Sequence, residues 1–181
     1  MRALGLDPVH DTRRTFDGLL TAMSRPGTVQ PVPDPADHAV VATLVDHEVT
    51  IATESDRLGD ALAGQGRLER APPAEADIVH APHRAGWNVR ECERGTLIEP
   101  SEGATIVYRV DSISGGRDTG TSVTLSGPGV DGPTTLSVSL PESELSALAA
   151  AQADYPRGVD AVFAAGNRVA TVPRSVTMEV A

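Results

Sequence analysis

Apolar residues recur at helical spacing in the first half of this chain, whereas apolar and polar residues more often alternate in the second half. Residues 7–25 form the clearest helical segment, because Asp7 is placed to cap a helix and Pro8 suits a first turn. Pro26 and Gly27 are expected to end this helix and to lead into an extended run over residues 28–32. We expect the helix to pack on the core through the apolar residues of one face, which are Val9, Phe16, Leu19, Leu20 and Met23.

Helical and extended patterns continue to alternate as far as about residue 93. The predicted elements are a helix over 34–47, a strand over 49–53, a helix from Ser55 to about Gly64, a loop over 70–76, a strand over 77–81, and a weak helix or irregular segment over 86–93. Two of the helices carry a recognisable start signal, because Pro35 follows an aspartate and Ser55 can cap the helix behind it.

Strand patterns dominate the second half, and glycine-rich turns separate them. The predicted elements are a strand over 102–113, its hairpin partner over 121–126, a third strand over 134–140, a helix over 141–153, and strands over 158–165, 168–172 and 174–180. This order predicts an α/β fold, with a mixed β-sheet flanked by helices on both faces. A length of 181 residues suits a single domain over 1–181.

Composition excludes several reaction classes, because all 15 basic residues are arginine and the chain contains no lysine. A pyridoxal phosphate aldimine, an aldolase-type imine and a phosphate-loop lysine all need a primary amine on a side chain. The 25 acidic residues give a formal net charge of -10, which argues against binding of nucleic acid. The acidic, lysine-free composition is typical of salt-adapted proteins, and an arginine-rich high-GC genome is an equally good explanation.

Cysteine content and hydropathy indicate where such a chain would work. Cys92 is the only cysteine, so an internal disulfide is impossible and an iron-sulfur cluster held by this chain alone is excluded. No run of 18 apolar residues occurs, and the N-terminal residues lack a basic-then-apolar signal pattern. These observations predict a cytoplasmic protein that does not enter a membrane.

Two apparent motifs carry little chemical information. Residues 127–132, GPGVDG, match the dinucleotide-binding pattern, but a strand rather than a helix follows them, and Pro128 lacks a backbone donor. A tight turn between antiparallel strands is the better interpretation, with an anion-binding nest as the alternative. His80, His83 and Cys92 have spacing that a zinc site could use, but no fourth ligand is evident, so we expect no metal site.

Four segments, in order, carry a resemblance to a known family. They are DPVHDTRRTFDGLLTAMSRPG at residues 7–27, EGATIVYRV at 102–110, TLSGPGV at 124–130, and YPRGVD with VPRS at 155–160 and 172–175. Together they resemble the PhnH family of carbon-phosphorus lyase subunits over nearly the whole chain. The resemblance is strongest at the two segments that contain RPG and LSGPG, and weakest over residues 55–95.

The resemblance implies an accessory, non-catalytic member of a complex with subunits G, I and J. That complex forms ribose 1-methylphosphonate 5-triphosphate from ATP and a phosphonate and releases adenine. The family further implies a homodimer when the protein is isolated, and a fold like the large domain of pyridoxal-phosphate-dependent transferases without that cofactor. ATP and Mg²⁺ are then ligands of the complex, and this chain binds no cofactor of its own. An enzymatic subunit and a stand-alone nucleotide or small-anion binding module are the alternatives.

Matching positions in the family pattern give candidate ligand or interface residues and no catalytic ones. Two arginines, each beside a proline, are hypothesised to lie near the glycine-rich turn and to contact a phosphate-bearing ligand or an acidic partner surface. The alternative is that each arginine caps a turn or pairs with a carboxylate such as Asp160. The candidate residues are Arg25, Gly27, Ser126, Gly127, Gly129, Asp160 and Arg174.

Overall fold

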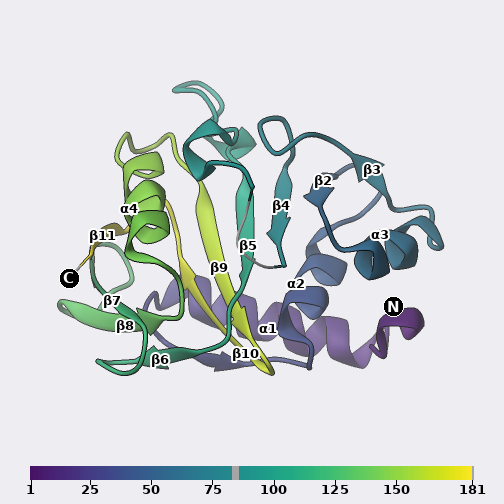
Figure 1. Ribbon diagram of the computed structural model, residues 1–181, viewed down its shortest axis with the longest axis horizontal. Helices are drawn as coiled ribbons and strands as arrows, with labels where there is room; N and C mark the ends of the chain where they lie inside the picture. The colour runs from purple at the N-terminus through teal and green to yellow at the C-terminus, as the bar shows by residue number, and fades with distance from the viewer. Residues whose placement is uncertain (83–85, 181) are drawn as a thin grey trace.

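The computed structural model describes residues 1–82 and 86–180, and these form a mixed α/β fold with two β-sheets. The α-helices of this part of the chain are α1 (His10–Ser24), α2 (Ala36–Leu44), α3 (Asp56–Ala63) and α4 (Glu142–Ala151). Short 3-10 turns cover Arg2–Leu4, Val89–Glu91 and Pro100–Glu102. Figure 1 shows the larger sheet running through the middle of the molecule, with α1 crossing below it.

The larger sheet has seven strands in the order β1-β10-β9-β5-β4-β2-β3. These strands are β1 (Gln30–Pro31), β2 (Thr50–Thr53), β3 (Glu69–Arg70), β4 (Ile78–Ala81), β5 (Thr105–Arg109), β9 (Asp160–Ala165) and β10 (Arg168–Val172). Neighbouring strands are parallel from β3 to β9, and β10 and β1 then continue the sheet in antiparallel pairing. The central strands β4, β5 and β9 are largely apolar and buried, as strands covered on both faces must be.

The smaller sheet is antiparallel, in the order β11-β7-β8-β6. Its strands are β6 (Ile113–Gly115), β7 (Thr121–Ser126), β8 (Thr134–Val138) and β11 (Thr177–Val180). The predicted hairpin between residues 102–113 and 121–126 is therefore wrong. The chain leaves β5 after Arg109 and enters the other sheet as β6, so β5 pairs with β4 and β9 while β7 pairs with β8 and β11. A strand pattern shows which residues are extended, but it does not show where the chain crosses from one sheet to another.

Helices cover both faces of the larger sheet, as predicted. Successive residues of β5 show this directly, since Ile106 and Tyr108 belong to one apolar core and Val107 belongs to the other. The first core also contains Leu145 of α4 and Leu136 of the smaller sheet, so the two sheets share it. The second core is formed with α1, α2 and α3.

The exposed face of α1 differs from the prediction. Leu19 is buried, but Val9, Phe16 and Leu20 are 68%, 54% and 59% exposed. Gly18 explains the difference, because a Cβ atom there would lie 2.8 Å from Cγ1 of Val32. Because α1 approaches Val32 closely at Gly18, the helix face that contains this glycine packs against the core. The larger apolar residues Val9, Phe16 and Leu20 therefore remain exposed to solvent.

Local signals placed several other elements correctly. Ser55 caps α3, accepting the Leu58 N–H at 3.3 Å, and Oδ1 of Asp7 accepts the His10 N–H at 2.6 Å at the start of α1. The second helix is shorter than predicted, and the segment around Trp87 contains one 3-10 turn. Within the described residues, no helix has both the length and the apolar character needed to span a bilayer.

Candidate functional site

The SGPG turn, residues 126–129, packs against the end of α1. A Cβ atom on Gly129 would lie 2.7 Å from the backbone oxygen of Ser24, so only a glycine allows this contact without a shift of the backbone. Gly27 packs against the neighbouring strands β7 and β8. A Cβ atom on Gly27 would lie 2.9 Å from Cγ2 of Thr134 and 3.3 Å from Cδ1 of Leu125. The predicted residues Gly27 and Gly129 therefore belong to one junction between α1 and the smaller sheet.

The same turn also contacts the segment that follows Arg174. Ser126 pairs with Thr177 across the β7–β11 ladder, and a Cβ atom on Gly127 would lie 3.3 Å from the backbone oxygen of Ser175. Residues 127–132 connect two antiparallel strands, β7 and β8, so the interpretation of GPGVDG as a turn is confirmed. The three segments that contain the candidate residues thus meet at this turn.

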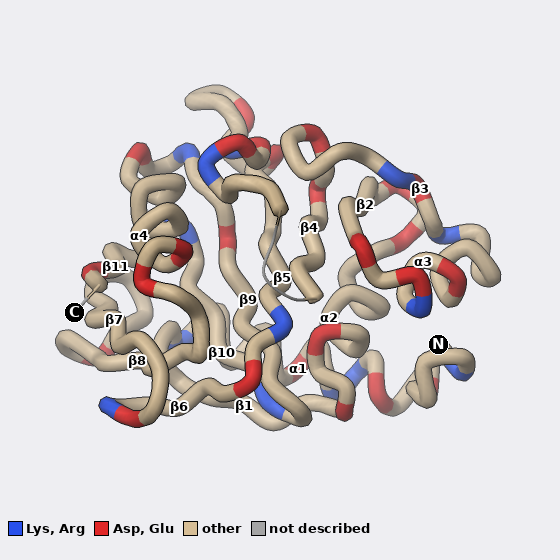
Figure 2. Tube along the Cα trace, in the orientation of Figure 1, with Lys and Arg blue, Asp and Glu red and all other residues tan. Residues whose placement is uncertain are grey.

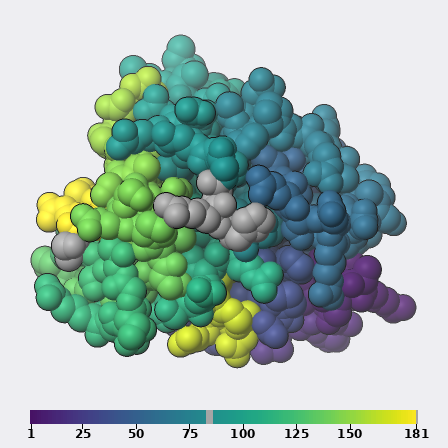
Figure 3. Space-filling model, viewed as in Figure 1, coloured from purple at the N-terminus to yellow at the C-terminus, as the bar shows by residue number. Residues whose placement is uncertain are grey.

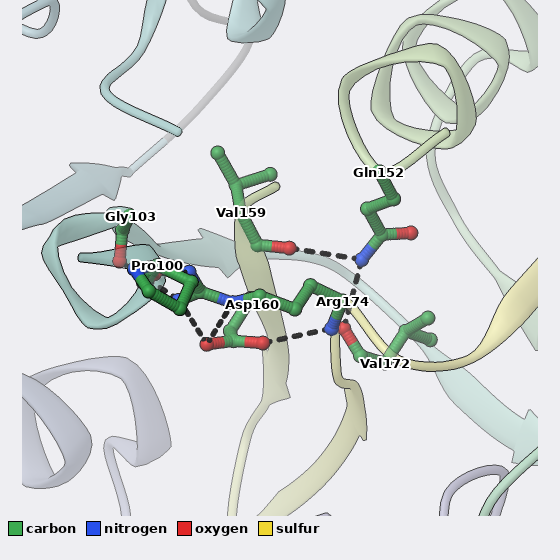
Figure 4. A network of polar contacts seen from close by, with 7 residues as sticks. All are labelled: Pro100, Gly103, Gln152, Val159, Asp160, Val172 and Arg174. Atoms are coloured by element: carbon green, nitrogen blue, oxygen red, sulfur yellow. Dashed lines mark hydrogen bonds and ion pairs between the residues drawn. The ribbon is translucent and has the colours of Figure 1, made fainter. Parts of the chain in front are cut away.

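The Arg174 side chain binds Asp160 (Figure 4). Its Nε lies 3.1 Å and its Nη2 2.5 Å from Oδ2 of Asp160, and its backbone N–H donates to Oδ1 at 2.8 Å. The guanidinium also donates to the backbone oxygens of Pro100 and Gly103. The two side chains are only 14% and 17% exposed. The arrangement ties the starts of β5 and β9 to the end of β10, which is the structural role considered as the alternative.

Arg25 has a different environment from Arg174. It is exposed at the C-terminal end of α1, and its side chain forms no hydrogen bond or salt bridge within residues 1–82 and 86–180. The neighbouring Pro26 and Gly27 are buried. A rigid backbone therefore presents the Arg25 guanidinium to the exterior beside the SGPG turn.

A cavity of about 290 Å³ lies between the end of β5 and the start of α4. The Tyr108 hydroxyl donates to Oε1 of Glu144 at 2.9 Å on its wall. Burial, together with the charge of Glu144, raises the pKa of Tyr108 well above its usual value. Figure 3 shows the green α4 segment beside the teal segment that contains residues 86–104 on this face. The phenol stays protonated at neutral pH, and it can act there only as a neutral hydrogen-bonding group.

His80 is part of a hydrogen-bonded chain that the sequence did not indicate. Its Nδ1 lies 2.9 Å from Oγ1 of Thr53, and its Nε2 lies 3.1 Å from Oδ2 of Asp37. Burial opposes ionisation of Asp37, but the hydrogen bond from His80 and the nearby charges of His38 and Arg109 outweigh it and lower the pKa of Asp37. Thr53 and Asp37 lie 27 and 43 positions from His80, and each has an ordinary local sequence context.

Of the three residues with zinc-like spacing, the structure describes His80 and Cys92, and these two have different environments. His80 binds Thr53 and Asp37, and His83 lies outside the described residues. Cys92 is buried, and burial, with the charges of Glu144 and Glu91, raises the pKa of its thiol to about 12. No group of three or more histidine, cysteine, aspartate or glutamate side chains within residues 1–82 and 86–180 is placed to hold a metal ion.

Comparison with known proteins gives a consistent result. Residues 5–179 match the family model described as "Bacterial phosphonate metabolism protein (PhnH)". The chain is 31% identical over 166 residues to a putative C-P lyase subunit protein, HtxG, of Stutzerimonas stutzeri, covering 88% of this chain and 82% of that one. It is 27% identical over 190 residues to the alpha-D-ribose 1-methylphosphonate 5-triphosphate synthase subunit PhnH of Rhizobium meliloti (strain 1021), covering 96% and 92%.

Proposed function

The chain belongs to the PhnH family of bacterial phosphonate metabolism proteins, and from this we propose that it is an accessory subunit of a carbon-phosphorus lyase complex. In that role it supports formation of ribose 1-methylphosphonate 5-triphosphate from ATP and a phosphonate, with release of adenine. The match over residues 5–179 carries this proposal, because it spans both sheets and all four α-helices of the described chain.

The uncovered face of α1 supports a role within a larger assembly. Val9, Phe16 and Leu20 are more than half exposed, and at 100° per residue they lie along a single stripe of the helix. We call these three residues the α1 stripe. Burying such side chains against a partner stabilises a complex by about 1.5–3 kcal/mol for each large side chain. The α1 stripe is our candidate docking surface for another protein of the complex.

The partners we propose are subunits G, I and J, with a homodimer forming when the chain is isolated. Arg25 and the SGPG turn lie near the C-terminal end of the α1 stripe, and they would contact a phosphate-bearing ligand or an acidic surface of a partner. Gly27, Ser126, Gly127 and Gly129 shape this junction, and Asp160 binds Arg174 in the neighbouring segment that ends just before Ser175. Acidic positions, red in Figure 2, outnumber basic positions, blue, along the chain. An exposed arginine such as Arg25 is therefore one of few cationic groups that could bind an anion.

We also propose that this chain binds no cofactor of its own, that ATP and Mg²⁺ bind to the assembled complex, and that the protein works in the cytoplasm. The lack of lysine supports the first of these statements, because a pyridoxal phosphate aldimine cannot form. We also propose that the fold is related to the large domain of pyridoxal-phosphate-dependent transferases. The mixed sheet with helices on both faces is compatible with this relationship.

The test is to co-express the chain with subunits G, I and J and to purify the complex through a tag on one of these partners. We expect this chain to co-purify, and we expect adenine release from ATP and methylphosphonate to fall when it is omitted. Release of adenine by the isolated chain would show a catalytic role instead. Failure to co-purify at any salt concentration at which the chain is folded would contradict the accessory role.

A further inference from the structure

The connections of the larger sheet diverge between β2 and β4, which lie next to each other (Figure 1). The chain passes from β2 to β3 on one side, whereas it passes from β4 to β5 on the other side. In open α/β sheets, ligands bind outside the carboxyl ends of the strands at such a point of divergence. A cavity of about 190 Å³ lies here, and its polar and aromatic lining comes from Thr53, Glu54, Arg70, His80 and Trp87.

The hydrogen-bonded chain Thr53–His80–Asp37 fixes what the cavity offers to a ligand. The lowered pKa keeps Asp37 ionised, so its Oδ2 accepts the Nε2–H of His80, and Nδ1 of the same ring forms a hydrogen bond with Oγ1 of Thr53. The Ser55 N–H also donates to Oγ1 of Thr53, at 3.1 Å. Held between His80 and Ser55, the Thr53 hydroxyl lines the cavity as a positioned polar group that can accept a further hydrogen bond from a ligand.

Arg70 supplies a positive charge on the same wall. Its Nη1 donates to the backbone oxygen of Thr53 at 3.2 Å, which holds the guanidinium at the cavity. Gly59 makes room for it, since a Cβ atom there would collide with Nη2 of Arg70. Arg70 forms no salt bridge within the described part of the chain, so most of its donors can reach a ligand.

Trp87 completes the lining with an aromatic ring. A positioned hydroxyl group, a guanidinium and an indole together suit a ligand that has a hydroxyl group, an anionic group and an apolar face. We propose that this cavity binds a small hydroxylated anion, such as a sugar phosphate or a sugar acid. Its hydroxyl group donates to Thr53, its anionic group binds Arg70, and its C–H face lies on Trp87. This binding goes beyond the accessory role, because docking onto partner subunits does not need a filled cavity.

A purely structural role for the same residues makes a different prediction. The chain Thr53–His80–Asp37 joins β2, β4 and α2, so it stabilises the fold whether or not a ligand binds. If that were its only role, changes at Thr53 would alter the free energy of unfolding. Changes at Arg70 would then have little effect either on the free energy of unfolding or on a binding constant. Ligand binding instead requires both side chains to affect a binding constant.

Intrinsic fluorescence provides a direct measurement, because Trp87 is the only tryptophan of the chain. The full-length protein is titrated with ribose 5-phosphate, with glucuronate and with neutral ribose. We expect a saturable change in Trp87 emission with at least one of the two anions, and the comparison between them distinguishes a phosphate from a carboxylate ligand. Neutral ribose should bind at least about tenfold more weakly than the anion, because it lacks the charged hydrogen bond to Arg70.

Matched variants decide between the two roles. Arg70→Met should weaken binding of the anion by about tenfold or more, whereas Arg157→Met, which changes a partly exposed arginine elsewhere, should not. Thr53→Val should weaken binding, and Thr53→Ser, which keeps the hydroxyl, should retain it even if Thr53→Val fails to fold. A saturable response that is unchanged in Arg70→Met, or no response to either anion, would overturn the proposal.

Discussion

Arg174 and Asp160 form a double contact, in which both the side chain and the backbone N–H of the arginine bind the carboxylate. The pair joins the segment after β10 to the first residue of β9, and it also holds two backbone oxygens of the 100–103 segment. The sequence made Arg174 a candidate ligand or interface residue, with pairing to a carboxylate such as Asp160 as the alternative. The contacts of Arg174 make it a residue that positions the starts of β5 and β9 against the end of β10.

Replacement of Arg174 by methionine should therefore destabilise the fold. The change leaves a largely buried Asp160 without its partner, and we expect a loss of about 2 kcal/mol in the free energy of unfolding. Urea denaturation followed by circular dichroism measures this loss. Arg157→Met is the control, because its exposed pair with Asp154 should contribute less than about 0.5 kcal/mol. Equal stabilities for the two variants would contradict the positioning role.

Gly129→Ala should separate two effects that glycine has on stability. Gly129 and Gly132 both have positive φ, 79° and 68°, so alanine at either position costs about 1 kcal/mol of backbone strain. At Gly129 the new methyl group would also meet the Ser24 oxygen at 2.7 Å, whereas at Gly132 no atom lies within 4 Å. We expect Gly129→Ala to be the more destabilising by about 1 kcal/mol or more in thermal unfolding. The opposite order would show that the junction with α1 is loosely packed.

The α1 stripe can be tested without disturbing the fold. Phe16→Glu combined with Leu20→Glu places charges on an exposed face, so we expect the free energy of unfolding to change by no more than about 0.5 kcal/mol per site. Co-purification with the partner proteins should be lost. Leu97→Glu changes a side chain that is 72% exposed outside the stripe, and it should co-purify normally. Normal assembly of the double variant would exclude the α1 stripe as the docking surface.

His38 should make the protein sensitive to mild acid. Burial lowers the pKa of His38, so below a pH of about 6.5 the unfolded chain takes up a proton at this residue that the folded protein refuses. Stability should therefore fall as the pH decreases from about 7.5 to about 5.5, and His38→Leu should reduce that fall. The exposed residue His47 gives the control, His47→Gln, which should keep the slope of the wild-type protein. Denaturant titrations at the two pH values provide the comparison.

Cys92 should be almost unreactive in the folded protein. With a pKa of about 12, its thiolate fraction at pH 8 is on the order of 10⁻⁴, and the side chain is only 4% exposed. An aromatic disulfide reagent should react with the native protein slowly and with the protein in denaturant at once. Rapid reaction of the native protein would show that this part of the core opens readily.

Local sequence signals were sufficient for most of the elements but not for their pairing. The Ser55 cap and the turn at residues 127–132 follow from the properties of a few adjacent residues, and both were predicted correctly. The partner of β7 and the buried side of α1 depend on distant contacts, such as the approach of Gly18 to Val32, and both were predicted wrongly. The hydrophobic pattern identifies an apolar face of a helix, but close packing with distant residues decides which face of the helix is buried.

The candidate sites show the same division. The family resemblance brought together the segments around the SGPG turn, and the pairing of Arg174 with Asp160, which was the alternative interpretation, is confirmed. Thr53, His80 and Asp37 were not grouped, because only the parallel pairing of β2 with β4 and the packing of α2 unite them. A threonine in a strand or an aspartate at a helix start is common, and neither signals a shared cavity on its own.

Both edges of the seven-stranded sheet are strands of only two residues, Gln30–Pro31 and Glu69–Arg70. Proline offers no amide hydrogen there, and the opposite edge carries adjacent charges, so neither edge is a good template for a strand of another molecule. A subunit that has not yet assembled exposes the apolar surface of its interface, and such a surface promotes aggregation. Here the uncovered surface is a helix, and the larger sheet offers no long edge strand, so unassembled copies are not expected to grow into fibrils through that sheet.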